Sequence, residues 1–248
     1  MAVLISMQKV FLNGDFIDKD SAKISIFDRG FIFGDGIYEV IPVINSTIVE
    51  KQGFWDRFKR SLSEIDLSLP YSTNEFETIL NRLIQINSLQ EGGLYIQITR
   101  GVAQRDFSFV SNITPTVMAF AFSDSVLEHP GAKSGITIIS TPDIRWKRRD
   151  IKSISLLGQC YAKNQATIAG ADECFMVEDG YVTEAGSSSA FIIKDGALIT
   201  KPLSNEILPG IRRQRLLNLA KEIGLKIEER KFSMDEVYNA DECFISAA

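Results

Sequence analysis

Lys152 is the residue whose surroundings in the sequence suggest covalent chemistry. It lies in the segment WKRRDIKS, shortly after Arg148 and Arg149. Neighbouring positive charge disfavours the ammonium form of a lysine and leaves more of the neutral amine, which is the form that makes a Schiff base with a carbonyl group. The same segment also fits an ordinary solvated basic stretch, because perturbed lysines are rare compared with surface lysines. Charge alone leaves both interpretations open.

Two charged side chains could accompany this amine. Glu184 stands beside a turn that contains Gly186 and three serines, where a carboxylate could hold a protonated ring nitrogen or could be an ordinary turn residue. Arg57 lies in an amphipathic segment near Phe54 and Phe58. Its guanidinium could reach a cleft while its stem covers apolar surface, or it could simply be solvated.

A phosphate site is indicated where Gly210, Ile211 and Arg212 open a helix. Free backbone N–H groups and the positive end of the helix dipole suit a phosphate there, although Pro-Gly is also a plain device for starting a helix. Taken together, the amine of Lys152, the carboxylate of Glu184 and this phosphate cup are the parts needed to hold pyridoxal 5′-phosphate.

The composition argues against several other kinds of chemistry. The chain of 248 residues has one histidine, His129, so histidine triads and multi-histidine metal centres lack their essential part. Three cysteines without any C-x-x-C favour neither a disulfide framework nor a zinc site. Neither G-x-G-x-x-G after a strand nor G-x-x-x-x-G-K-[ST] occurs. Any chemistry must then use Lys, Arg, Tyr and carboxylate side chains, or a cofactor, and we expect no metal.

Charge and hydropathy point to small-molecule partners. Lys and Arg number 27 against 32 Asp and Glu, which gives a net charge of −5, whereas nucleic-acid and anionic-membrane binders need a basic face. The apolar runs fall short of the ~20 residues that span a bilayer, and the start of the chain lacks the marks of a signal peptide. We expect a cytoplasmic protein with neither nucleic acid nor membrane as partner.

Helix and strand patterns are mixed along the whole chain. Asn13-Gly14 predicts a tight hairpin, and a capping box of Ser72 and Glu75 predicts a helix start. The spacing of apolar residues predicts helices at 54–65, 76–84, 156–168 and from Gly210 to a left-handed cap at Gly224, and strands at 94–99, 116–122, 136–140, 173–177, 190–194 and 197–200. These elements predict a mixed α/β (α+β) fold. The polar segment SDSVLEHPGAKSG lacks periodicity and marks the predicted domain boundary.

Five ordered segments between Phe11 and the end of the chain carry a family resemblance. They are DRGFIFGDGIYEV at 28–40, ITRGVAQR at 98–105, DIRWKRRDIKSISLLG at 143–158, VTEAGSSSAFIIKDG at 182–196 and ILPGIRRQ at 207–214. In these segments the chain resembles the fold-type IV pyridoxal-phosphate enzymes, and among them most closely the D-amino acid aminotransferases.

The resemblance implies roles for the cofactor-binding residues. Lys152 would form the Schiff base and then move the proton between the substrate α-carbon and the cofactor. Glu184 would pair with the pyridine nitrogen and keep it protonated. Arg57 would bind the phosphate, helped by the amides of Ile211 and Arg212.

The resemblance also implies a substrate site, and at two positions this sequence differs from the residues that relatives often have. Tyr38 would line the pocket, and Arg105 would receive the substrate carboxylate through a bidentate fork. Phe107 stands where relatives often have His, which alters the carboxylate site. Loss of a donor to a buried charge costs about 1.5 to 3 kcal/mol, roughly one to two decades in affinity, unless another group replaces it. Arg212 stands where relatives often have Thr, and it could bind the phosphate or face solvent.

The family architecture implies a small N-terminal α/β domain at 1–122, a linker at 123–133 and a larger pyridoxal-phosphate-binding domain at 134–248, with the active site in the cleft between them. Members of the family are usually homodimers, and the partner subunit contributes to the pocket. Relatives continue for some tens of residues beyond the position of Ala248, so we expect the C-terminal end to be incomplete.

The leading hypothesis is a transaminase that moves the amino group of a D-amino acid such as D-alanine to a 2-oxo acid such as 2-oxoglutarate by a ping-pong mechanism. A branched-chain L-amino acid aminotransferase shares the cofactor machinery, but GIYEVIPV fits the D-specific pattern better. A 4-amino-4-deoxychorismate lyase uses the same fold and lysine. A scaffold that kept the fold without the activity is the non-enzymatic alternative.

Overall fold

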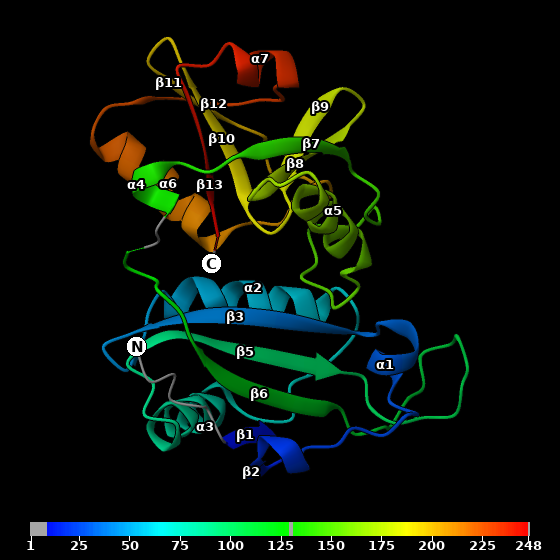
Figure 1. The fold of residues 1–248 in the computed structure, drawn as a ribbon. Helices are drawn as coiled ribbons and strands as arrows, with labels where there is room; N and C mark the ends of the chain where they lie inside the picture. Colours follow the sequence, from blue (N-terminus) through cyan, green and yellow to red (C-terminus); the bar gives the residue numbers. More distant parts are fainter. Residues whose placement is uncertain (1–8, 129–130, 248) are drawn as a thin grey trace. The chain divides into compact units, whose positions relative to one another are not determined.

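The computed structural model describes residues 9–128 and 131–247, so His129 and Ala248 lie outside the described residues. The chain forms two compact units, which Figure 1 shows as ribbons. Among the described residues, the first unit contains 9–128 and Lys152–Ser155, and the second contains 131–151 and 156–247. Four residues of the C-terminal half therefore belong to the first unit. Helices and strands are mixed in both units, which confirms the predicted fold class.

The first unit is built on a six-stranded antiparallel sheet with the order β2-β1-β6-β5-β3-β4. Asn13 and Gly14 adopt positive φ angles of 50° and 109° and connect β1 to β2, which confirms the predicted hairpin. Long β3 and β5 pair along nine residues each, and β5 lies with β6 in the middle of the sheet. The strands are β1 (Lys9–Leu12), β2 (Asp15–Asp18), β3 (Gly36–Ile44), β4 (Thr47–Ile48), β5 (Glu91–Thr99) and β6 (Thr116–Ser123).

Two amphipathic helices cover this sheet. Helix α2 (Lys51–Ser63) packs on β3, and helix α3 (Thr73–Ile86) packs on β1 and β6 (Figure 1). Phe58 of α2 stacks on Phe76 of α3 with ring centroids 6.3 Å apart, so apolar side chains of both helices share one core. The capping box of Ser72 and Glu75 is present at the start of α3, as predicted. Short η1 (Lys19–Ser21) and α1 (Arg29–Phe33) precede β3.

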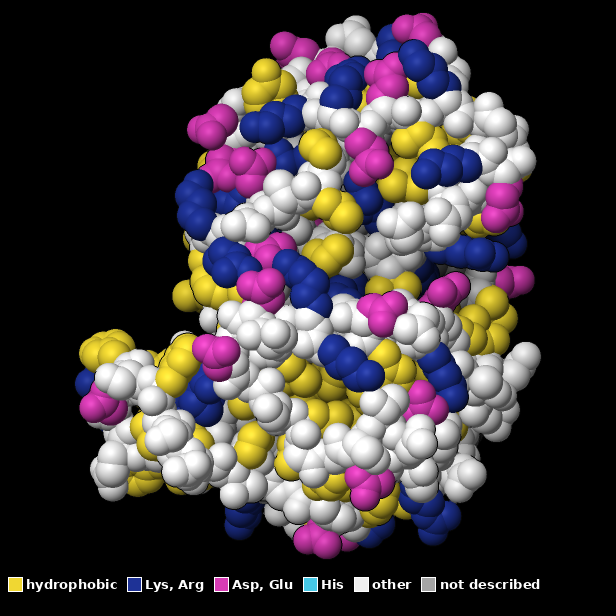
Figure 2. Space-filling model, turned by 180° about the vertical axis from the view of Figure 1, so that it is seen from behind, with side chains coloured by type: hydrophobic (Ala, Val, Ile, Leu, Met, Phe, Trp, Pro, Cys, Tyr) yellow, Lys and Arg dark blue, Asp and Glu magenta, His cyan; other side chains and the backbone are white. Residues whose placement is uncertain are grey.

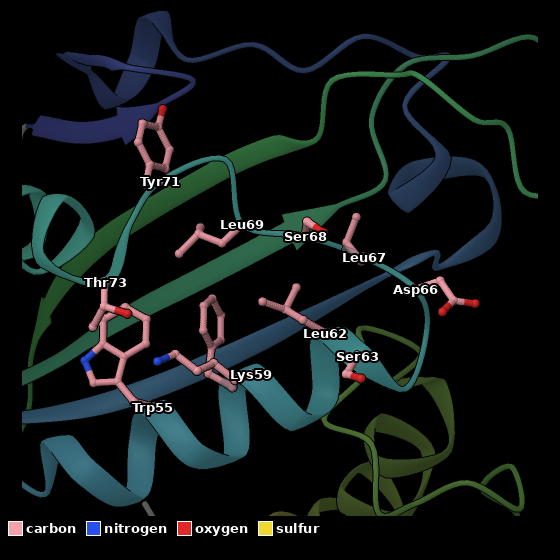
Figure 3. Close-up of a pocket in the computed structure, with 11 residues that line it drawn as sticks. Trp55, Lys59, Leu62, Ser63, Asp66, Leu67, Ser68, Leu69, Tyr71 and Thr73 are labelled. Atoms are coloured by element: carbon pink, nitrogen blue, oxygen red, sulfur yellow. The ribbon is translucent and has the colours of Figure 1, made fainter.

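An open pocket of about 540 Å³ lies between α2 and the segment that leads to α3 (Figure 3). Apolar side chains form much of its lining, and Lys59 and Asp66 add one charge of each sign. The lining residues are Trp55, Phe58, Lys59, Leu62, Ser63, Asp66, Leu67, Ser68, Leu69, Tyr71 and Thr73. This pocket contains none of the site residues predicted from the sequence.

The second unit contains two smaller sheets. The four-stranded sheet has the order β12-β11-β10-β13, and the three-stranded sheet has the order β7-β8-β9. The strands are β7 (Ile138–Pro142), β8 (Glu173–Glu178), β9 (Tyr181–Ala185), β10 (Ser189–Lys194), β11 (Ala197–Thr200), β12 (Lys226–Glu229) and β13 (Glu242–Ser246). The predicted strand at 136–140 thus lies two residues further along the chain.

Helices pack on both of these sheets. Helix α5 (Leu157–Ile168) packs on β7 and β8, and helix α6 (Ile211–Glu222) packs beside β12. Gly224 follows α6 with a φ of 74°, which confirms the predicted left-handed cap. Short α4 (Gly131–Ser134) and α7 (Met234–Tyr238) complete the unit. Among the helices of the described residues, none has the length and apolar character required to cross a bilayer.

Candidate active site

Lys152 lies in an extended segment that pairs with the start of β3. The Tyr38 amide donates to the Lys152 carbonyl at 2.9 Å, and the Ile154 amide donates to the Gly36 carbonyl at 3.1 Å. The Lys152 amide in turn donates to Ser61 Oγ of α2 at 3.3 Å. These bonds fix the backbone of the lysine on the sheet, and its Nζ lies 4.2 Å from the centroid of the Tyr38 ring. The structure thus brings Lys152 and Tyr38 together.

The arginines before Lys152 have carboxylate partners. Arg148 Nε donates to Asp150 at 3.0 Å. Arg149 is buried, and its Nη1 lies 2.6 Å from Glu178 and 3.3 Å from Asp143. The positive charge on which the sequence argument relied is therefore matched by acids. The alternative of a wholly solvated basic stretch is also wrong, because Arg149 is part of the interior of the second unit.

Arg57 is not a solvated helical arginine. Its Nε and Nη2 donate to the two carboxylate oxygens of Glu39 at 2.8 and 2.7 Å, and the side chains are 4% and 0% exposed. Glu39 lies on β3 directly after Tyr38, so the sheet that holds Lys152 also orients Arg57. The bidentate geometry fixes the plane of the guanidinium group, which suits it for binding a phosphate.

Glu184 is held as a buried ion-pair partner in the second unit. Arg145 Nη1 donates to Glu184 Oε2 at 2.6 Å, and the Leu208 amide donates to Oε1 at 3.1 Å. Arg145 is itself fixed by Asp143, whose oxygens accept from its Nε at 3.0 Å and its Nη2 at 2.7 Å. Burial raises the pKa of Glu184, and the Arg145 charge opposes that shift. A carboxylate held in this way suits a cationic ring N–H.

The start of α6 offers backbone donors. Gly210 is the N-cap and has no side chain to bond the first amides, among them those of Ile211 and Arg212. A Cβ at Gly210 would lie 2.8 Å from Ser189 Oγ, so this turn admits only glycine without movement. Arg212 is half-buried, whereas the next residue, Arg213, is buried and pairs with Glu229 at 2.7 Å.

Arg105 lies in the exposed loop between β5 and β6. Its guanidinium carbon is 5.7 Å from the centroid of the Phe33 ring and 5.2 Å from that of the Phe107 ring. The two rings are themselves in contact, with centroids 5.4 Å apart. Phe107 therefore gives Arg105 an aromatic neighbour where a histidine would have given it a polar one.

The predicted site residues fall into two groups. Tyr38, Arg57, Arg105 and Lys152 belong to the first unit, and Glu184, Ile211 and Arg212 belong to the second. The sequence argument missed Glu39, Asp143 and Arg145. Glu39 could have been noticed as a carboxylate within the apolar strand GIYEVIPVI, and Arg145 as a cation seven residues before Lys152.

Comparison with known proteins gives the class to which this site belongs. Residues 36–248 match the family model for amino-transferase class IV. The D-alanine aminotransferase of Staphylococcus haemolyticus is 41% identical over 242 residues, which cover 97% of this chain and 86% of the relative. The chain therefore belongs to the class IV aminotransferases.

Solved structures show the same fold. The branched-chain amino acid aminotransferase of Escherichia coli superposes with a TM-score of 0.90 at 23% identity, covering 97% of this chain and 83% of that one. A putative 4-amino-4-deoxychorismate lyase from Legionella pneumophila superposes with a TM-score of 0.81 at 26% identity, covering 92% and 84%.

The protein is an aminotransferase that depends on pyridoxal 5′-phosphate. Its donor set fits this cofactor. The Lys152 amine could bind the aldehyde, and the buried carboxylate of Glu184 could accept from the ring nitrogen. The backbone amides at the start of α6 and the fixed guanidinium of Arg57 are two kinds of donor that could bind the phosphate.

Proposed function

We propose that this protein is a D-amino acid transaminase, which moves the amino group of a D-amino acid such as D-alanine to a 2-oxo acid such as 2-oxoglutarate in a ping-pong reaction. The 41% identity to a D-alanine aminotransferase, over 97% of this chain, is the observation that carries the proposal. The presence of Lys152, Glu184 and Arg57 supports it, because these are the lysine, the carboxylate and the phosphate-binding arginine of the proposed site.

Each cofactor-binding residue has a distinct role in this proposal. Pyridoxal 5′-phosphate, when bound, supplies an aldehyde carbon and a protonated ring that accepts electrons from the substrate α-carbon. Lys152 Nζ would bind the aldehyde covalently and would later carry the α-proton, and it lies 4.2 Å from the centroid of the Tyr38 ring. Glu184 accepts the hydrogen bond of the ring N–H. Arg57 and the amides of Ile211 and Arg212 bind the phosphate.

Tyr38 and Arg105 form the proposed substrate site. Tyr38 presents its ring beside the lysine amine, and the guanidinium of Arg105 binds the substrate carboxylate. The Phe33 and Phe107 rings beside Arg105 leave its charge without a neutralising acid on those sides. Such a guanidinium can form a charge-assisted hydrogen bond with a carboxylate.

We also propose that the protein works as a homodimer in the cytoplasm. Exposed apolar side chains gather on the first unit around α1 and the loop after β5, where the Arg29 amide donates to the Gly101 carbonyl and so joins the two segments. Figure 2 shows hydrophobic side chains at this end of the unit. They include Ile26, Phe27, Phe31, Val102, Phe107 and Phe109. A cluster of this kind on a soluble protein is typical of a protein interface. Sedimentation should give twice the mass of 27.7 kDa, and a monomer would contradict the dimer.

The reaction itself is tested with purified protein loaded with pyridoxal 5′-phosphate. D-alanine and 2-oxoglutarate are added, and D-glutamate is measured by chiral chromatography. We expect D-glutamate from D-alanine and no product when L-alanine replaces it. Formation of L-glutamate from L-leucine would favour the branched-chain enzyme. Release of pyruvate and 4-aminobenzoate from aminodeoxychorismate, without D-glutamate formation, would favour the lyase.

A further inference from the structure

Asp35 joins two buried arginines at the start of β3. Arg29 Nε and Arg100 Nε donate to the same oxygen, Asp35 Oδ2, at 2.7 and 2.9 Å. The side chain of Arg29 is 2% exposed, and those of Arg100 and Asp35 are each 7% exposed. Two buried guanidinium groups thus share one carboxylate oxygen, and Arg100 also donates to the Asp66 carbonyl at 3.0 Å and to the Ile65 carbonyl at 2.6 Å.

The side chains of Arg29 and Arg100 also contact the loop between β5 and β6. Arg29 Nη1 donates to the Asp106 carbonyl at 2.5 Å. The guanidinium carbon of Arg100 lies 3.7 Å from the centroid of the Phe109 ring. The loop is therefore contacted at two points, one on each side of Phe107, by side chains that Asp35 helps to hold.

These two anchors lie next to Arg105. The anchored carbonyl belongs to Asp106, the residue that follows it, and the Asp106 carboxylate accepts from the Ser108 amide at 2.8 Å and tightens the turn. The Phe33 ring beside the Arg105 guanidinium comes from α1, which also carries Arg29. The backbone next to the exposed Arg105 is thus bonded to the buried cluster of Asp35 and its two arginines.

We propose that Asp35 is a positioning residue for substrate binding, which acts through Arg29 and Arg100 to fix the loop that carries Arg105. The inference rests on the proposed function, in which Arg105 binds the substrate carboxylate. Ordering a loop upon binding costs conformational entropy, so a loop that is fixed beforehand binds its ligand more tightly. Loss of the Asp35 charge should therefore weaken the binding of the amino acid and leave the cofactor site as it is.

The test uses the loaded enzyme and the variant Asp35→Asn, which keeps the shape of the side chain and removes its charge. Trypsin cleavage after Arg105 is followed by mass spectrometry, because cleavage reports how often the loop opens. We expect trypsin to cleave the variant about tenfold faster than the unmodified protein. A factor of about ten corresponds to the loss of one hydrogen bond to a charged group. The KM for D-alanine should rise about tenfold, with kcat changed by less than about threefold and the cofactor absorbance unchanged.

Asp28→Asn is the matched control. Asp28 is also buried beside α1, and its side chain accepts from the Gly30 amide, Thr99 Oγ1 and Thr116 Oγ1. We expect it to lower the melting temperature without a tenfold change in cleavage after Arg105 or in KM. Asp35→Glu, which retains the carboxylate, should recover part of the lost affinity. If Asp35→Asn fails to fold, Arg29→Lys should give the same effect, because lysine lacks the two separate nitrogens with which Arg29 bonds Asp35 and the Asp106 carbonyl.

Two results would overturn the proposal. One is an unchanged rate of cleavage after Arg105 in folded Asp35→Asn, and the other is faster cleavage with an unchanged KM. Failure of the unmodified protein to turn over D-alanine would refute the proposed function instead, because the cleavage rate reports the anchoring of the loop without any turnover.

Discussion

The buried pair of Glu39 and Arg57 allows a test of both stability and cofactor binding. Glu39→Gln keeps the volume of the side chain but leaves the Arg57 guanidinium without its counter-charge. Both side chains are almost fully buried, at 0% and 4% exposure, so solvent cannot replace the lost charge. Breaking such a pair lowers the free energy of unfolding by about 3 to 5 kcal/mol. In a chain of this size that corresponds to a drop of roughly 6 to 20 °C in melting temperature.

The cofactor should restore part of this loss. If Arg57 binds the phosphate, the phosphate charge compensates the guanidinium in Glu39→Gln. The stability difference between the variant and the unmodified protein should then narrow by about 1.5 to 3 kcal/mol when pyridoxal 5′-phosphate is saturating. Denaturant titrations of both proteins, with and without cofactor, measure this difference.

Glu77→Gln provides a surface control for the same substitution. Glu77 pairs with Lys51 at 2.9 Å, and both side chains are partly exposed, so we expect a change of less than about 1 kcal/mol that does not depend on cofactor. The opposite result is that the free energies of unfolding of Glu39→Gln and of the unmodified protein differ by the same amount or by more when cofactor is added. That result would show that Arg57 does not bind the phosphate. If Glu39→Gln lowered the free energy of unfolding by less than about 1 kcal/mol, the pair would behave like a surface ion pair, and burial would not strengthen it.

Three other variants test the remaining roles. Lys152→Ala should abolish turnover and the borohydride-trapped cofactor adduct seen by mass spectrometry, with an unchanged circular dichroism spectrum. Arg105→Ala should raise the KM for D-alanine by about ten- to a hundredfold and leave the cofactor affinity unchanged; equal losses would place Arg105 at the phosphate. Hydrogen bonds from Arg149 and Lys147 lower the pKa of Glu178 from 4.5 to about 2, so its stabilisation is present above pH 4.5 and is lost as pH falls toward 2. Glu178→Gln should therefore flatten the decline in unfolding free energy over this range, measured by urea denaturation.

The features predicted best from the sequence are those that neighbouring residues determine. The Asn13-Gly14 turn and the capping box of Ser72 and Glu75 need only residues within a few positions of one another. Gly224 ends α6 because glycine adopts positive φ without a Cβ clash. Local rules of this kind also predicted most of the helices and strands, and the structure confirms the mixed α/β fold that they indicated.

The environment of the site could not be predicted in the same way. Glu39 and Arg57 meet across 18 positions, and Asp35 and Arg100 across 65, so the pairing depends on how β3, α2 and β5 pack. The ion pairs of the arginines before Lys152 could not be predicted for the same reason, since the carboxylate partner of Arg149, Glu178, lies on β8. The family resemblance supplied the roles of the site residues, and those roles stay predictions until the variants are measured.

The return of residues Lys152–Ser155 to the first unit limits how this enzyme can be divided into fragments. A polypeptide that ended between the two units would carry the sheet on which Lys152 is held but not Lys152 itself. The complementary piece would carry the lysine without the strand edge that its backbone bonds require. Reconstitution from two chains would therefore have to rebuild this short stretch of strand pairing.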